Sequence, residues 1–62
     1  MFYVTLVARK INGEYDKSID VFDNYDDAKT MQIKLYSKYA FDPDCDYVRC
    51  FVLDDYGNTL SW

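Results

Sequence analysis

Hydrophobic and polar residues alternate along the start of the chain, and they alternate again after a short polar break. A period of two is the spacing of a β-strand, because successive side chains point to opposite faces. The break contains Asn12 and Gly13, a pair typical of tight hairpin turns that need positive φ at both central residues. The pattern predicts a β-hairpin over about residues 2–22.

The length of this turn sets which residues of the two strands face each other. With Asn12 and Gly13 as a two-residue loop, we expect three cross-strand pairs: Val4 with Val21, Leu6 with Ile19, and Arg9 with Asp16. Two of these pairs join aliphatic residues and the third joins opposite charges, which favours this register.

The period then changes to that of a helix, over about residues 25–40. Asp23 or Asn24 is expected to cap the start of the helix, and Pro43 lies beyond its end. Apolar residues recur every three or four positions and define a stripe that is expected to be buried: Ala28, Met31, Leu35 and Tyr39.

Strand alternation returns over about residues 47–62 and predicts a second hairpin. Its loop is expected to have three residues, because a two-residue loop would turn Arg49 toward the core. The expected loop consists of Asp55, Tyr56 and Gly57, with Gly57 in the left-handed conformation, and the expected pairs are Val52 with Leu60 and Cys50 with Trp62.

The order ββαββ predicts one α+β domain over residues 1–62, in which two hairpins form a mainly antiparallel sheet with one helix packed on one face. A chain this short buries only ~60% of the surface that its unfolded form exposes. A single short helix covers only one face of four strands, so the other face is expected to stay open.

The open face is expected to carry an apolar surplus, and contiguous apolar patches usually mark interfaces. Its predicted residues are Tyr3, Thr5, Val7, Asp20, Tyr47, Arg49, Phe51 and Leu53. The helix adds Ile33, opposite its buried stripe, and Tyr36 at the flank. Seven residues are therefore candidates for a protein interface: Tyr3, Val7, Ile33, Tyr36, Tyr47, Phe51 and Leu53.

The chain is acidic, with 11 Asp and Glu against 7 Lys and Arg, a net charge of −4 and a pI near 4.4. Proteins that hold phosphate backbones usually carry an excess of cations, so direct nucleic-acid binding is not expected. No stretch has the ~18 apolar residues of a membrane helix, and the start lacks a signal-peptide pattern, so we expect a cytoplasmic protein without membrane contact. The acidic surface is expected to include Asp16, Asp20, Asp23, Asp26, Asp27, Asp54 and Asp55.

The stretch FDPDCDYVRCF places Asp42, Asp44 and Asp46 as in the first positions of a calcium loop. The positions that should hold glycine and glutamate hold Tyr47 and Leu53, so we interpret the stretch as a solvated loop without a metal.

The two cysteines of this stretch are expected to be free thiols. Cys45 and Cys50 would lie ~16 Å apart along an extended strand, too far for a disulfide. Because the chain has no histidine, neither a zinc site nor a thiol nucleophile with its base is expected. Cys50 is predicted to lie in the core and Cys45 to be exposed or half-exposed.

No part of the sequence has the pattern of a catalytic site. Asp54 and Asp55 suit a turn, and Asp26 and Asp27 suit the start of a helix. The chain has no glycine-rich phosphate loop and no Ser/His/Asp set. We expect no enzymatic activity and no cofactor.

Seven tyrosines and a tryptophan raise the question of what the open face binds. Aromatic rings stack on bases in single-strand binders, but those surfaces are also basic, whereas this face is expected to be acidic or neutral. Tyrosine is equally a favoured anchor of protein interfaces, so protein contact is the better interpretation. A dimer that encloses a nucleotide in an aromatic-lined pocket stays open as an alternative.

Three stretches carry a resemblance at the level of organisation: the strand that begins at Met1, DVFDNYDDAKTMQIKLYSKY at the helix, and VLDDYGNTL at the closing turn. Together they resemble the small acidic accessory proteins of bacteriophages and mobile elements, some of which inhibit host defence systems such as CRISPR. The resemblance implies a stoichiometric inhibitor that binds a host protein. That host protein can be one that itself binds nucleic acid.

These features predict a non-enzymatic protein-binding module, a homodimer, that acts on a host protein by occlusion or by acidic mimicry of nucleic acid. Two alternatives stay open. One is a dimer that sequesters a small ligand or nucleotide between protomers, and the other is a structural domain that only self-associates.

Overall fold

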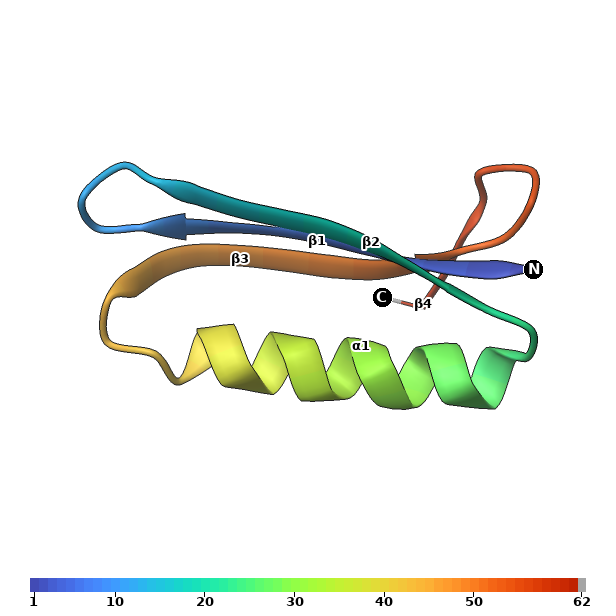
Figure 1. Cartoon of the computed structure of the whole chain (residues 1–62). Coiled ribbons are helices and arrows are strands. Elements are labelled where there is room, and N and C mark those ends of the chain that lie inside the picture. Colours follow the sequence, from blue (N-terminus) through green and yellow to red (C-terminus); the bar gives the residue numbers. More distant parts are fainter. Residues whose placement is uncertain (62) are drawn as a thin grey trace.

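The order of the elements in the computed structural model is ββαββ, as the sequence predicts. The structure describes the backbone of residues 1–61 and the side chains of residues 1–60. Its elements are β1 (Phe2–Lys10), β2 (Tyr15–Phe22), α1 (Tyr25–Ala40), β3 (Cys45–Leu53) and β4 (Thr59–Ser61). The strands form one antiparallel sheet in the order β2-β1-β3-β4. Figure 1 shows α1 along one face of the sheet, with no other helix or strand of the described chain on the opposite face.

The helix begins where the sequence predicts, and Asn24 rather than Asp23 is the cap. The Asn24 Oδ1 accepts a hydrogen bond from the backbone N–H of Asp27 at 2.8 Å, and the Asn24 Nδ2 donates to the Asp27 carboxylate at 2.9 Å. The cap thereby satisfies a backbone donor that the first turn leaves unpaired.

The core lies between α1 and the two central strands. Its buried apolar residues are Val4 and Leu6 of β1, Ala28 of α1, and Cys50 and Val52 of β3. Met31, Leu35 and Tyr39 pack against this cluster partly buried, so the predicted helix stripe is confirmed. Gln32 is also completely buried, at the centre of the helix face that meets β3, and the sequence pattern did not predict it.

The predicted register of the first hairpin is wrong by one residue. Tyr3 lies opposite Val21 and Thr5 opposite Ile19, in place of the expected pairing of Val4 with Val21 and of Leu6 with Ile19. The cause is the turn, because Lys10 N–H donates to Glu14 O and Gly13 N–H donates to Lys10 O, which makes a three-residue loop. Gly13 has a φ of 91°, which suits the bulge position of such a loop.

The expected pair of Arg9 and Asp16 is also wrong. Arg9 lies opposite Tyr15, and its Nε donates to the Asp46 carboxylate at 3.0 Å. Asp16 instead lies 3.9 Å from the ammonium group of Lys10.

The second hairpin has the predicted three-residue loop. Asp54 N–H donates to Asn58 O, Gly57 N–H donates to Asp54 O, and Gly57 has a φ of 81°. The expected pair of Val52 with Leu60 is wrong, because an irregularity between Val52 and Leu53 places Val52 opposite Ser61. The expected pair of Cys50 with Trp62 lies outside the described residues.

Candidate functional site

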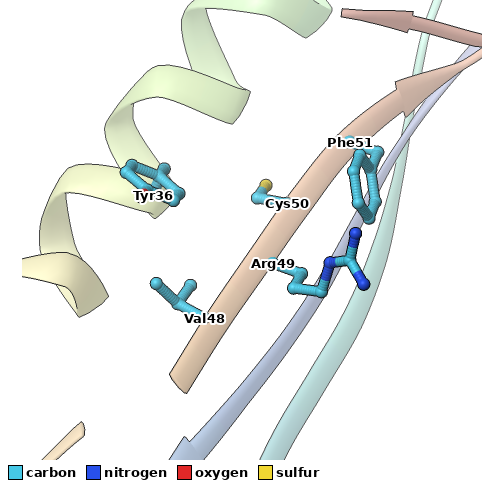
Figure 2. A pocket seen from close by; sticks show the side chains of 5 residues that line it. All are labelled: Tyr36, Val48, Arg49, Cys50 and Phe51. Atoms are coloured by element: carbon cyan, nitrogen blue, oxygen red, sulfur yellow. The ribbon is translucent and has the colours of Figure 1, made fainter. Parts of the chain in front are cut away.

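The face of the sheet away from α1, called here the uncovered face, is the candidate site. Figure 2 shows Arg49 and Phe51 on this side of β3, whereas Val48 and Cys50 point toward α1. Strand alternation places the other residues, and the register brings them into rows across β2, β1 and β3. The rows are Val21, Tyr3 and Leu53; Ile19, Thr5 and Phe51; Lys17, Val7 and Arg49; and Tyr15, Arg9 and Tyr47.

The centre of this face is apolar and open to solvent. Ile19 is 69% exposed and Val21 is 52% exposed, although both are aliphatic residues of a strand. A shallow hollow of about 430 Å³ lies between β1 and β2, lined by Thr5, Leu6, Val7, Lys17, Ser18 and Ile19. Large exposed aliphatic side chains beside a hollow are the composition of an interface rather than of an ordinary solvated sheet.

The charged residues in these rows are the cations Arg9, Lys17 and Arg49, and each lies over an aromatic ring. Asp46 of β3, which lies outside the rows, binds Arg9. The distance from cation to ring centroid is 5.7 Å for Arg9 over Tyr47, 5.6 Å for Lys17 over Tyr15, and 5.1 Å for Arg49 over Phe51. The hydrogen bond with Asp46 raises the pKa of Arg9. Neither Lys17 nor Arg49 has a carboxylate partner among the described side chains.

The expectation of an acidic or neutral face is therefore wrong, and the register explains it. The one-residue shift moves Asp20 from the uncovered face to the side of α1. There its negative charge helps to raise the pKa of the Cys50 thiol, although burial of that thiol is the larger cause. On the same side, burial raises the pKa of Tyr39, and a hydrogen bond with Asp16 adds to the effect.

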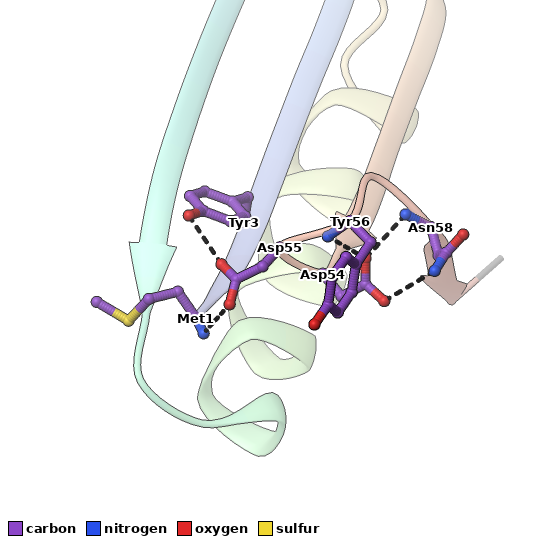
Figure 3. A network of polar contacts seen from close by, with 6 residues as sticks. All are labelled: Met1, Tyr3, Asp54, Asp55, Tyr56 and Asn58. Atoms are coloured by element: carbon purple, nitrogen blue, oxygen red, sulfur yellow. Dashed lines mark hydrogen bonds and ion pairs between the residues drawn. The ribbon is translucent and has the colours of Figure 1, made fainter.

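The turn between β3 and β4 bounds one end of the uncovered face (Figure 3). The Asp55 carboxylate accepts hydrogen bonds from the Tyr3 hydroxyl at 3.0 Å and from the terminal amine of Met1 at 3.1 Å. The bond from the amine is the main cause of a lowered pKa for Asp55, and the bond to Asp55 raises the pKa of Tyr3. Asp55 thus links the turn between β3 and β4 to Met1 and Tyr3 instead of presenting a free charge.

Asp54 stabilises the same turn from within. Its carboxylate accepts from the backbone N–H of Asn58 at 2.9 Å and of Tyr56 at 2.8 Å, and from the Asn58 side chain at 3.1 Å. The bond from the Asn58 backbone is the main cause of its lowered pKa. Two of the seven predicted acidic-surface residues therefore have structural roles in this turn.

The other predicted acidic residues lie with α1. Asp26 and Asp27 are in the first helical turn, and Asp23 precedes the Asn24 cap. Asp16 and Asp20 are on the helix side of β2. These five aspartates consequently lie on the helix side of the sheet, opposite the apolar residues and the cations of the uncovered face.

The structure divides the seven interface candidates. Five lie on the uncovered face, as predicted: Tyr3, Val7, Tyr47, Phe51 and Leu53. Ile33 is 55% exposed on α1, and Tyr36 packs partly buried against the core, so neither belongs to that face. The sequence pattern missed Tyr15, Lys17, Ile19 and Val21 because β2 alternates equally well in either register, and only the loop length distinguishes the two.

Two aspartates of the stretch FDPDCDYVRCF serve local structure. The Asp42 carboxylate accepts from the backbone N–H of Asp44 at 2.9 Å, and Asp46 binds Arg9. No group of three metal-ligating carboxylates or thiols gathers in the described part of the chain. Both cysteines are free, with Cys45 half-buried and Cys50 in the core, where each is predicted.

No protein-family model matches the chain, and no curated protein or solved structure matches it either. Within residues 1–61, no helix has the length and apolar character needed to cross a membrane.

Proposed function

We propose that the chain is a non-enzymatic protein-binding module that docks its uncovered face onto a partner protein. One observation carries the proposal: Ile19 and Val21 are more than half exposed on the same face as Tyr3 and Phe51. Leaving such aliphatic groups in water costs free energy that contact with a partner recovers.

The charges of the uncovered face indicate the chemistry of the partner's surface. Lys17 and Arg49 lie in the same row as Val7, so the complementary surface is apolar with carboxylates beside it. Such docking acts by occlusion of the partner's surface. Acidic mimicry of nucleic acid would use the opposite side of the molecule, where Asp16, Asp20 and the first turn of α1 lie.

The resemblance to phage-type inhibitors supplies the class of partner in this proposal, a host protein in the cytoplasm. A homodimer is consistent with the same face, because a second copy would cover the same aliphatic residues. Self-association and host binding then compete for one surface, and they are distinguished by measuring both.

A second candidate is binding of a nucleotide or a single strand, and the cation–aromatic pairs favour it. Arg9 with Tyr47 and Arg49 with Phe51 place charge beside rings that can stack on bases. Protein contact remains the stronger proposal, because Ile19 and Val21 offer no ring for stacking and the net charge of the chain is −4.

The test compares two variants of the full chain. Ile19→Thr combined with Val21→Thr alters the uncovered face, and Ile33→Thr is the matched control, since Ile33 is a similarly exposed aliphatic residue on α1. Affinity capture from bacterial lysate should lose its specific partner with the double variant and keep it with the control. Equal capture by both variants would reject the uncovered face as the interface.

Two further measurements separate the alternatives. Light scattering over a range of protein concentrations reports self-association, which the double variant should abolish if the face pairs with a second copy. Fluorescence anisotropy with a labelled oligothymidine and melting with added nucleotides report the second candidate, because a bound ligand raises stability with its saturation. Tight oligonucleotide binding without protein capture would replace the main proposal by the second.

A further inference from the structure

The outer edge of β3 is mostly unpaired, and this edge is a different surface from the uncovered face. β3 has nine residues, whereas β4 has three and pairs only with Val52 and Leu53. Within the described chain, the edge from Cys45 to Cys50 therefore lacks a neighbouring strand on its outer side. Unpaired strand edges are templates for the addition of another strand.

The pairing shows which peptide groups face outward from β3. Lys10 bonds to Glu14 of the β2 side, so the even-numbered residues of β1 turn their peptide groups to β2 and the odd-numbered ones turn to β3. The partners of those odd-numbered residues on β3 include Arg49 and Phe51. Val48, Cys50 and Val52 consequently present their N–H and C=O groups at the outer edge, and β4 already pairs with Val52 there.

A hollow of about 170 Å³ follows this edge, lined by Tyr36, Val48, Arg49, Cys50 and Phe51 (Figure 2). Consecutive residues of a strand point to opposite faces, so a hollow that all four strand residues line must lie beside the backbone edge. Tyr36 closes it from α1. The combination of a free strand edge and a flanking helix is the geometry in which an extended peptide adds to a sheet.

Gln32 provides an independent observation at the same edge. Its side chain is completely buried, and its Nε2 donates to the outward carbonyl of Cys50 at 3.0 Å. Its Oε1 is buried without a hydrogen-bond partner among the described residues. Gln32 therefore holds the Cys50 carbonyl from inside the protein, and its own Oε1 is closed to an added strand.

We propose that the outer edge of β3 binds an extended peptide segment of a partner protein as an additional strand, in line with β4. The backbone N–H and C=O of Val48 pair with the segment. Side chains of the segment that point toward α1 enter the hollow beside Tyr36 and Val48 and are small and apolar. The side chain opposite Arg49 is acidic, because Arg49 has no carboxylate partner among the described residues.

A peptide fits this edge better than a second copy of the chain does. In an antiparallel pairing of two β3 strands, a register centred on Val48 sets Arg49 of each copy opposite Tyr47 of the other, with no carboxylate. A symmetric pairing centred on Arg49 sets two guanidinium groups opposite each other, which is unfavourable. A separate segment fits better, since its sequence supplies the carboxylate opposite Arg49 that both of these registers lack.

The test uses the full, isotope-labelled chain and two peptides, acetyl-Ser-Val-Glu-Val-Ser-amide and the same peptide with lysine in place of glutamate. We expect the glutamate peptide to shift the amide resonances of Val48, Cys50 and the Gln32 side chain, and to bind roughly fivefold more tightly than the lysine peptide. Arg49→Glu, a change at an exposed position, should reverse this preference. Val48→Pro should abolish binding, because proline removes the outward N–H.

Three results would overturn the proposal. The first is no shift of these resonances at millimolar peptide. The second is a set of shifts confined to the uncovered face, around Ile19 and Val21. The third is a concentration dependence of the Val48 resonance without peptide, which would assign the edge to a second copy. If Val48→Pro does not fold, the reversal by Arg49→Glu decides the result alone.

Discussion

Ile19 of β2 lies opposite Thr5 of β1, and its side chain is 69% exposed on the side of the sheet away from α1. One residue of loop length fixes this relationship. Since side chains alternate with a period of two, a shift by one residue moves every side chain of β2 to the other face. The uncovered face gains two aliphatic residues and loses an aspartate, which makes it apolar and basic.

Substitution of Ile19 tests this register directly. Ile19→Thr keeps a β-branched side chain in the strand, and we expect a change in the free energy of unfolding within about 0.5 kcal/mol, as for other exposed positions. Leu6→Ala, in the core of the neighbouring strand, should cost about 2–5 kcal/mol. Urea unfolding of both variants makes the comparison. Similar losses for the two would place Ile19 in the core and restore the two-residue loop.

The two cysteines should differ in their reactivity toward a thiol reagent. Burial is the main cause of the raised pKa of Cys50, so little thiolate forms there at neutral pH. Cys45 is half-buried, and its Sγ lies 3.2 Å from the carbonyl oxygen of Tyr47. Ellman's reagent should titrate one thiol in the native protein and both after denaturation. Cys45→Ser should remove the fast reaction, and a fast reaction that survives this change would show that Cys50 is accessible.

Acid should loosen the turn between β3 and β4 before it unfolds the core. The pKa values of Asp54 and Asp55 lie below the ordinary value of 3.8, so both carboxylates contribute full stability above that pH. The contribution is lost as the pH falls through the lowered native values. Amide shifts of Tyr56 and Asn58, followed from pH 6 to pH 2, should report the loss. Asp54→Asn should flatten the response of Asn58, and an unchanged titration in this variant would contradict the role of Asp54.

A charge at position 32 should destabilise the fold far more than the loss of the amide group does. Gln32→Glu buries a carboxylate without a cation, and we expect a loss of at least about 3 kcal/mol at neutral pH. Burial raises the pKa of such a carboxyl, so stability should recover as the pH falls toward 5, where the neutral acid can donate to the Cys50 carbonyl. Thermal melting at pH 5 and pH 7 measures the difference. Gln32→Met, which carries no charge, is the control and should show no recovery.

Most of the fold follows from local pattern in the sequence. Alternation and the helical period predicted the element order, and Asn24 and Gly57 act at the positions where their chemistry suits a cap and a left-handed turn. These signals reside in short stretches, where backbone preference and burial agree. The strand order could not be predicted from local pattern, because the pairing of β1 with β3 depends on contacts between segments distant in the sequence.

The uncovered face was only partly predictable, and Gln32 was not predictable at all. Asn12 and Gly13 fit both loop lengths, so local chemistry did not fix the register of β2. The chosen register relied on pairing Leu6 with Ile19 in a core that extends over β2, yet α1 packs mainly on β3 and β1. The polar side of β2 therefore meets water at the edge of the helix. Gln32 is buried because β3 offers it a carbonyl, and a helical pattern contains no information about that partner.

The position of α1 over the two central strands also governs how the molecule opens. β2 is held by its ladder to β1 and by Phe22 at one end, with little of the helix above it. In native-state hydrogen exchange, amides of β2 should therefore exchange through a local opening of lower free energy than the opening that exposes β1 and β3. A partner seated on Ile19 and Val21 would suppress that opening. Binding of a partner to the uncovered face would then slow hydrogen exchange along the whole of β2, including amides that the partner does not contact.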